Sequence, residues 1–90
     1  MEKIKINNKE FSIVKNFKNA LDKESIESYV TDYFMSYDYI VGDWSYGKLR
    51  LKGFFESKNK KCNDMNNIND LEEYIENYCA FGCAYFVLKK

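Results

Sequence analysis

The side chains best suited to chemistry gather at the tip of an expected hairpin. A carboxylate, an indole, a hydroxyl, a phenol and two glycines follow one another in the segment Gly42-Asp43-Trp44-Ser45-Tyr46-Gly47. Glycine lets backbone approach a ligand closely, so a ligand-binding tip is one interpretation. Turn chemistry is the simpler one, in which Gly47 takes a positive φ, Asp43 accepts hydrogen bonds from turn N–H groups and Trp44 covers the core.

Positive charge gathers on the return strand of this hairpin and in the segment after it. Between Trp44 and Lys61 a single acid, Glu56, stands against six bases: Lys48, Arg50, Lys52, Lys58, Lys60 and Lys61. Because side chains alternate along a strand, Leu49, Leu51 and Phe55 are expected on the core side. The opposite side is expected to be solvated and carries Lys48, Arg50, Lys52 and Phe54.

Basic and aromatic side chains on one strand face can together bind nucleic acid. The bases neutralise phosphates, and rings such as Tyr46 and Phe54 can stack on nucleotide bases. Against this, the chain has a formal net charge of +0 and a single Arg, and a charged strand face is commonly only solvated. Nucleic-acid binding is therefore kept as an alternative.

Negative charge follows in the next segment. The span from Cys62 to Tyr78 contains no base and five acids: Asp64, Asp70, Glu72, Glu73 and Glu76. The basic hairpin and this acidic segment could meet within one molecule, between two copies, or each with a charged partner. A solvated helix face, whose acids are favourable near the helix N-terminus, explains the same residues without a partner.

The cysteines invite a redox or metal interpretation that the rest of the chain does not support. Cys79 and Cys83 form a C-x-x-x-C pair, but the chain has no His and only Cys62 besides, so a closed zinc site lacks ligands. An odd count of three Cys without an export signal predicts reduced thiols. We therefore expect Cys79 and Cys83 to be core residues, with no metal and no cofactor bound.

Catalytic motifs are equally hard to find. No spacing resembles a nucleophile–base pair, a phosphate-binding loop, a dinucleotide-binding glycine pattern or a His-based metal motif. A small enzyme with its site at the hairpin tip is thus the weaker alternative.

Local patterns predict the elements that position these residues. Strands are expected at Lys3 to Ile6, Phe11 to Val14, Tyr39 to Trp44, Lys48 to Phe55 and Ala84 to Leu88. A helix capped by Asp22 is indicated by apolar residues at helical spacing, namely Ile26, Tyr29, Val30, Tyr33 and Phe34. Glu56 to Asn67 is polar and without period, which predicts a mobile loop. A second helix is expected from Asn69, which has capping-box spacing to Glu72, with the stripe Leu71, Tyr74, Ile75, Tyr78 and Cys79 and an end at Gly82.

The order ββαββαβ predicts an α+β fold, with a mainly antiparallel sheet and two helices packed against it. Ninety residues suit a single domain spanning residues 1–90, and 46% hydrophobic with 18% aromatic content can build its core. The start MEKIKINNKEF lacks the apolar run of a signal peptide, and no later stretch is long enough to cross a bilayer. The sequence therefore predicts a cytoplasmic location and no membrane partner.

Two blocks resemble a known family. At YDYIVGDWSYGKLRLKGFF (Tyr37 to Phe55) and YCAFGCAYFVLKK (Tyr78 to Lys90) the chain resembles the YutD-like family, small cytosolic proteins of Gram-positive bacteria. The resemblance implies an α+β fold and a bacterial cytosol, and it implies no particular activity. Members of the family often carry a longer polar C-terminal tail, whereas this chain stops at Lys90.

These patterns together predict a non-catalytic binding or adaptor domain whose working surface is the hairpin from Asp43 to Lys52. A protein is the expected partner, while nucleic acid and self-association remain open. The side chains expected to bind are Asp43, Trp44, Tyr46, Lys48, Arg50, Lys52 and Phe54.

Overall fold

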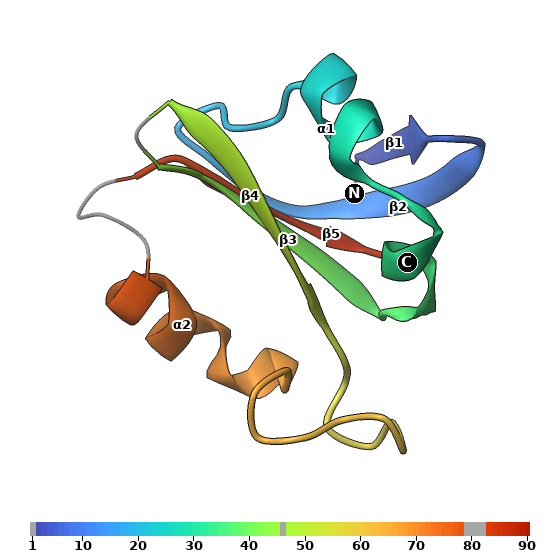
Figure 1. The fold of residues 1–90 in the computed structure, drawn as a ribbon, viewed down its shortest axis with the longest axis vertical. Coiled ribbons are helices and arrows are strands. Elements are labelled where there is room, and N and C mark those ends of the chain that lie inside the picture. The colour runs from blue at the N-terminus through green and yellow to red at the C-terminus, as the bar shows by residue number, and fades with distance from the viewer. Residues whose placement is uncertain (1, 46, 79–82) are drawn as a thin grey trace.

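The computed structural model describes residues 2–45, 47–78 and 83–90, and in these residues five strands form one antiparallel sheet (Figure 1). The strand order is β1-β2-β5-β3-β4. Both the α+β class and the order ββαββαβ are thereby confirmed, and β1 and β4 lie at the two edges. The strands are β1 (Lys3–Ile6), β2 (Lys9–Phe17), β3 (Tyr39–Ser45), β4 (Lys48–Phe54) and β5 (Tyr85–Lys89).

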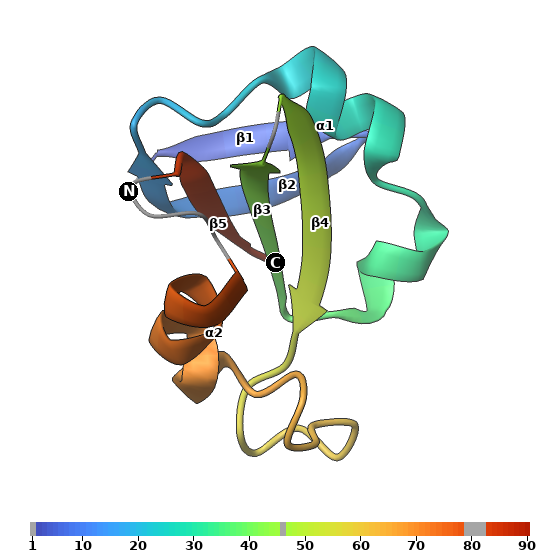
Figure 2. The same cartoon turned by 60° about the vertical axis from the view of Figure 1, so that its left-hand side comes forward.

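The two helices, α1 (Lys23–Tyr29) and α2 (Leu71–Tyr78), lie on opposite faces of the sheet (Figures 1 and 2). Alternation along β5 shows why both faces are apolar. Phe86 and Leu88 pack into the core on the α1 side, whereas Val87 packs into the core on the α2 side. The central strands are therefore buried on both faces, which accounts for their nearly continuous apolar sequences.

Each core joins residues that are distant in the sequence. On the α1 side the buried residues are Ile6, Phe11, Ala20, Ile26, Val30, Ile40, Leu49, Phe86 and Leu88. On the α2 side Val41, Phe54 and Val87 are buried, and they are covered by Tyr39, Ile68, Leu71, Tyr74, Ile75 and Tyr85. The β3–β4 hairpin thus contributes to both cores.

The first helix is shorter than its apolar stripe predicts. At Val30 the backbone turns extended, with ψ at 119°, and a short 3-10 helix (Asp32–Ser36) follows. Tyr33, beyond this end, is 66% exposed, and Tyr29, the last residue of α1, is 54% exposed, so their predicted place in the core is wrong. Asn7 gives a physical reason, because its Nδ2 donates to the carbonyl of Val30 at 3.0 Å and satisfies the helix end.

Helix caps are also partly as predicted. Asp22 is the N-cap of α1, but its carboxylate accepts from the Ser25 hydroxyl at 3.1 Å and bonds no cap N–H. The predicted Asn69–Glu72 capping box is wrong, because a 3-10 turn (Ile68–Asp70) precedes α2 and Asn67 accepts from the Asn69 N–H at 2.9 Å.

Within the described residues, no helix combines the length and the apolar character needed to cross a membrane.

Candidate functional site

Asp43 does not offer its carboxylate to a ligand at the hairpin tip. It is 1% exposed and lies opposite Arg50 in the β3–β4 register. The Arg50 Nε donates to Asp43 Oδ1 at 2.9 Å. The predicted role of Asp43 as acceptor for turn N–H groups is therefore wrong, and its carboxylate is neutralised within the hairpin.

Trp44 and Gly47 have the structural roles that turn chemistry predicts. The half-buried Trp44 packs against the core on the α1 side, and its Nε1 donates to the Ala20 carbonyl at 2.8 Å. Gly47 has a φ of 76°, a conformation that disfavours other residues. Tyr46 lies outside the described residues.

The predicted solvated face of β4 is partly covered. Lys48 and Arg50 are exposed, but Lys52 is half-buried and Phe54 is only 1% exposed. The ring centroids of Phe54 and Tyr74 are 5.4 Å apart in an edge-on contact, because α2 packs on this face. A wholly solvated face is therefore wrong at Phe54, whose ring cannot stack on a ligand in this conformation.

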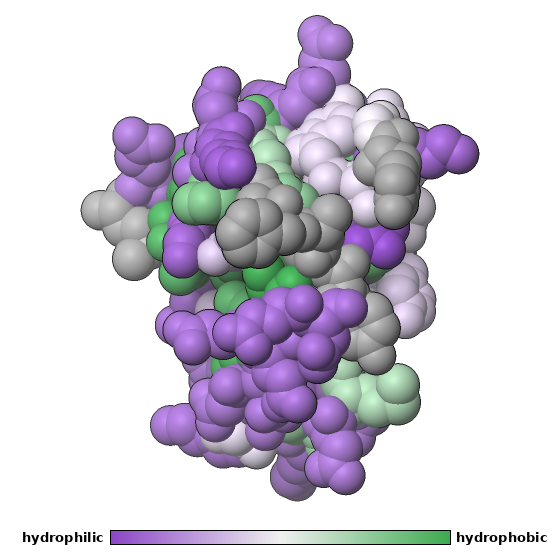
Figure 3. Space-filling view, turned by 90° about the vertical axis from the view of Figure 1, so that its left-hand side faces the viewer, coloured by the Kyte–Doolittle hydropathy of each residue, from purple (hydrophilic) through white to green (hydrophobic). Residues whose placement is uncertain are grey.

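A groove of about 690 Å³ runs between β4 and α2, and we call it the α2 groove. Phe54 and Tyr74 supply rings, and Met65, 78% exposed, stands at the side formed by the loop. Hydrophilic side chains cover the outer face of the half that contains α2 (Figure 3). The full lining is Arg50, Leu51, Lys52, Phe54, Asp64, Met65, Asp70, Glu73, Tyr74 and Asn77.

The charges that line the α2 groove differ in how far they are already engaged. Arg50 pairs with Asp43, and the Lys52 Nζ lies 5.4 Å from the Phe54 ring centroid and 5.7 Å from that of Tyr74. The carboxylates of Asp64, Asp70 and Glu73 are exposed and form no ion pair with any described residue. The basic hairpin and the acidic segment thus meet within one molecule, and the acids are the charges left open.

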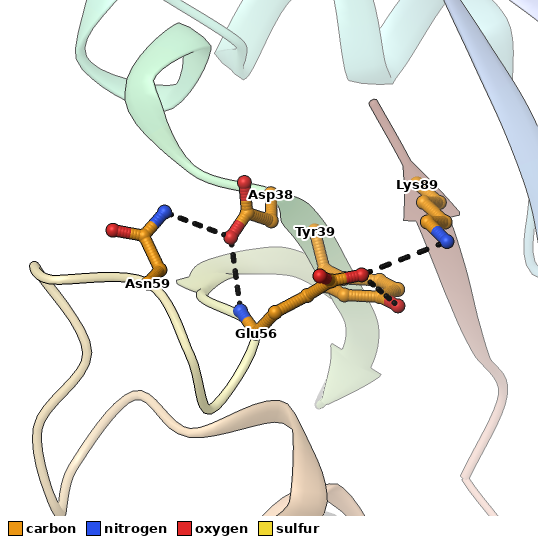
Figure 4. Close-up of polar contacts among 5 residues, drawn as sticks. All are labelled: Asp38, Tyr39, Glu56, Asn59 and Lys89. Atoms are coloured by element: carbon orange, nitrogen blue, oxygen red, sulfur yellow. Dashed lines mark hydrogen bonds and ion pairs between the residues drawn. The ribbon is translucent and has the colours of Figure 1, made fainter.

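The loop that closes this groove is anchored to the sheet (Figure 4). Asp38 Oδ2 accepts from the Glu56 backbone N–H at 2.9 Å and from Asn59 Nδ2 at 3.0 Å. Glu56 Oε1 accepts from the Tyr39 hydroxyl at 3.4 Å and lies 3.6 Å from Lys89 Nζ. Sequence reasoning missed this cluster. The segment from Glu56 to Asn67 is rich in Asn, whose side chain commonly forms hydrogen bonds with turn backbone, and this was the available signal that the segment is ordered.

Backbone contacts also replace the structureless loop that the sequence predicts. The Phe55 N–H donates to the Asn66 carbonyl at 2.7 Å, and the Ile68 N–H donates to the Phe55 carbonyl at 2.9 Å. Asn63 Oδ1 accepts from the Met65 N–H at 2.8 Å. These bonds hold the acidic and apolar wall of the groove next to the end of β4.

A second hollow of about 200 Å³ lies on the α1 side of β4, and we call it the tyrosine hollow. The hydroxyls of Tyr33 and Tyr37 are 2.8 Å apart within it. This hydrogen bond, together with partial burial, raises the pKa of Tyr37 above its ordinary value. Its lining is Tyr33, Phe34, Tyr37, Leu51, Lys52, Gly53, Asn63, Met65 and Asn66.

The cysteine predictions are corrected at one position. Cys83 is half-buried and disulfide-bonded, so the prediction of a reduced thiol is wrong there. Cys62 is free, and Cys79 and Gly82 lie outside the described residues. No group of three or more His, Cys, Asp or Glu side chains in the described part of the chain is arranged to hold a metal ion.

Comparison with known proteins gives consistent matches over nearly the whole chain. Residues 5–89 match the model of the YutD-like family, described as "Putative antitoxin YutD-like". A protein of Bacillus subtilis (strain 168) named "Putative antitoxin YutD" is 53% identical over 87 residues, which are 97% of this chain and 96% of that protein. The solution NMR structure of protein yutD from B. subtilis is 52% identical, with a TM-score of 0.79, and the match covers 99% of this chain and 81% of that chain.

Proposed function

The chain belongs to the YutD-like family, and from that premise we propose that it is a non-catalytic binding protein of the antitoxin kind that its relative's name states. It captures a partner protein on the α2 groove, in the bacterial cytoplasm. The observation that carries this proposal is the groove itself, about 690 Å³ between an edge strand and a helix. The working surface therefore moves from the hairpin tip to the outer part of β4 and the facing side of α2.

The make-up of the α2 groove suits a protein ligand. Met65 and Tyr74 offer apolar surface, and charged side chains of both signs surround it. An apolar centre with a polar rim is the usual anatomy of protein interfaces.

Nucleic acid fits the same surface less well. A phosphate entering the α2 groove meets the carboxylates of Asp64, Asp70 and Glu73, while Arg50 is held by Asp43. Phe54, which the sequence offered for stacking, is buried. An enzyme site at the hairpin tip is disfavoured because the tip carboxylate, Asp43, is enclosed and ion-paired.

A charge reversal on α2 tests the proposal. Glu73 lines the groove, whereas Glu76 is exposed on the same helix outside the lining, so Glu73→Lys and Glu76→Lys form a matched pair. The immobilised chain is used to capture partners from the lysate of a bacterium that carries it, and any retained protein is then co-expressed with each variant. Wild type and Glu76→Lys are expected to retain it and relieve its growth inhibition, and Glu73→Lys to lose both.

Other outcomes reject the proposal. Equal retention by the two variants would remove the α2 groove as the working surface. Retention of nucleic acid that falls steeply with salt would favour the nucleic-acid alternative, because phosphate contacts release counterions. Reversal of Arg50 is avoided, because it would bring a carboxylate against the buried Asp43 and disturb the fold.

A further inference from the structure

The tyrosine hollow has an aromatic wall, formed by the 3-10 helix that follows α1 and by the residue after that helix. The ring centroids of Tyr33 and Phe34 are 5.1 Å apart and those of Tyr33 and Tyr37 are 5.5 Å apart, both in edge-on contacts. Tyr37 lies on Gly53 of β4, where a Cβ would overlap its ring, and its centroid is 4.7 Å from that of the buried Phe55. The aromatic wall is therefore positioned against the end of β4.

Apolar surface gathers at this hollow. Among the large apolar side chains that the structure describes, Met65 and Tyr33 are the two most exposed, and both line the tyrosine hollow. Tyr29, which is exposed on the preceding helix, does not line it. Apolar side chains that are exposed together around a concavity are typical of a site that a partner covers.

The free polar groups of the tyrosine hollow are hydrogen-bond donors. Asn66 Oδ1 accepts from the Asn63 N–H and Asn63 Oδ1 accepts from the Met65 N–H, each at 2.8 Å, so the two carboxamide NH₂ groups remain to donate. The hydrogen bond between the hydroxyls of Tyr33 and Tyr37 uses one O–H and leaves the other. The described residues that line the hollow include no carboxylate, so a Lys or Arg side chain would find no anionic partner there.

We propose that the partner protein inserts one aromatic side chain, a Phe, Tyr or Trp, into the tyrosine hollow while it covers the α2 groove. This proposal rests on the proposed function and names the kind of residue that anchors the partner. The hollow and the groove share Leu51, Lys52 and Met65 in their linings, so a partner that covers one of them reaches the other. Aromatic side chains seated in pockets are common among the residues that contribute most to protein binding.

Size and lining both favour a single ring. An α-helix with its side chains is about 10 Å across, so a hollow of about 200 Å³ admits a side chain and not a helix. A ring in the hollow can make edge-on contacts with Tyr33 and Tyr37 and can contact the Met65 thioether, which pairs favourably with aromatic edges. The carboxamides of Asn63 and Asn66 can donate to a carbonyl beside the inserted ring.

Capped amino acids test which side chain the hollow accepts. The probes are N-acetyl-phenylalanine amide, N-acetyl-leucine amide and N-acetyl-arginine amide, titrated into the ¹⁵N-labelled full chain. The side-chain NH₂ signals of Asn63 and Asn66 report on the hollow, and that of Asn77 reports on the α2 groove. The phenylalanine probe is expected to shift the first two with a dissociation constant of about 1–10 mM and to leave Asn77 unchanged. We expect the leucine and arginine probes to bind at least about fivefold more weakly.

Two exposed tyrosines form a matched pair of variants, because Tyr33 lines the hollow and Tyr29 does not. Tyr33→Ala is expected to abolish the shifts caused by the phenylalanine probe and to weaken partner retention by about tenfold or more. Tyr29→Ala is expected to keep both. Met65→Ala changes an exposed loop residue of the same lining and should also weaken retention, with the far-UV circular dichroism of the folded chain unchanged.

Several results would overturn the aromatic anchor. They are a phenylalanine probe that shifts neither Asn63 nor Asn66, equal or tighter binding of the leucine or arginine probe, and equal partner retention by Tyr33→Ala and Tyr29→Ala. If retention still depends on Glu73 in that last case, the proposed function stands and the anchor alone fails.

The opposite pattern separates the two proposals in the other direction. Loss of retention with Tyr33→Ala but not with Glu73→Lys would support the anchor and move the working surface from the α2 groove to the tyrosine hollow. A lysate from which no protein is retained would reject both.

Discussion

Asp43 and Arg50 show that a residue predicted to bind a ligand can have a structural role instead when it is buried. A carboxylate beside glycines at a hairpin is equally compatible with a ligand site and with an internal ion pair. The register places Asp43 directly opposite Arg50, and the carboxylate is 1% exposed. Because a buried charge is costly without a partner, the pair is primarily a structural feature of the hairpin.

Removal of Arg50 should therefore destabilise the fold. Arg50→Ala leaves the Asp43 carboxylate buried without its ion-pair partner, and we expect the free energy of unfolding to fall by about 2 kcal/mol. Lys48→Ala removes an exposed charge from the same strand without breaking an ion pair of a buried residue, and it should change the free energy of unfolding by less than about 0.5 kcal/mol. Urea denaturation measures both, and equal effects of the two substitutions would contradict the structural role of the pair.

Gly42 is required by a close approach across the sheet. A Cβ at this position would overlap the ring of Phe86, which is fully buried, and would also press on Leu51. We expect Gly42→Ala to lower the free energy of unfolding by about 2 kcal/mol. At Gly53 the overlapping ring belongs to the half-buried Tyr37, which has more room to move, so Gly53→Ala should cost less. Thermal or urea unfolding measures both substitutions. A smaller loss of free energy of unfolding for Gly42→Ala than for Gly53→Ala would show that the Phe86 ring moves to accommodate the added methyl group.

The 3-10 helix after α1 illustrates what a helical stripe can and cannot predict. Spacing correctly indicates Ile26, within α1, and Val30, the residue that ends it, as core residues. It fails at Tyr33, because Asn7 satisfies the end of α1 and the chain leaves the helix at Val30. That contact comes from a turn more than twenty positions earlier in the chain, and local periodicity carries no information about it.

The Tyr33–Tyr37 pair of this segment gives a pH-dependent prediction. The hydrogen bond with Tyr33, helped by burial, raises the pKa of Tyr37 above its ordinary value of 10.0. Since the neutral form is favoured in the folded state, this contribution to stability is complete below about pH 10 and is lost as the pH rises through the folded pKa. The free energy of unfolding should fall more steeply above pH 10 for wild type than for Tyr37→Phe. Parallel pH profiles in urea titrations would contradict this linkage.

The strands were more predictable than the surface they create. Alternating and β-branched patterns locate the β3–β4 hairpin. Asn7 and Asn8, with φ of 49° and 69°, form the turn between β1 and β2. The same patterns say that α2 is amphipathic, but they do not say which sheet face it covers. Its position over Phe54 is set by non-local packing, and that packing turns a predicted open face into one wall of the α2 groove.

Across the molecule, the two cores share the sheet as a common wall. Ile40 packs on the α1 side and its neighbour Val41 on the α2 side. We propose that residues 1–90 unfold as one cooperative domain, because loss of β3 would expose both cores. Near-UV circular dichroism and far-UV circular dichroism should then give coincident thermal transitions. Separate transitions for the two signals would indicate that the α2 side melts by itself.

Hydrogen exchange mass spectrometry of the complex with the captured partner shows whether the partner binds at the outer part of β4 and the facing side of α2. Backbone amides in the peptides covering Lys48–Phe54 and Leu71–Tyr78 are expected to exchange more slowly in the complex. Amides in the peptides covering Lys3–Ile6 and Lys9–Phe17 are expected to exchange at the rate measured in the free chain. Protection confined to β1 and β2, with β4 and α2 unchanged, would place the partner elsewhere on the sheet and rule out binding at the α2 groove.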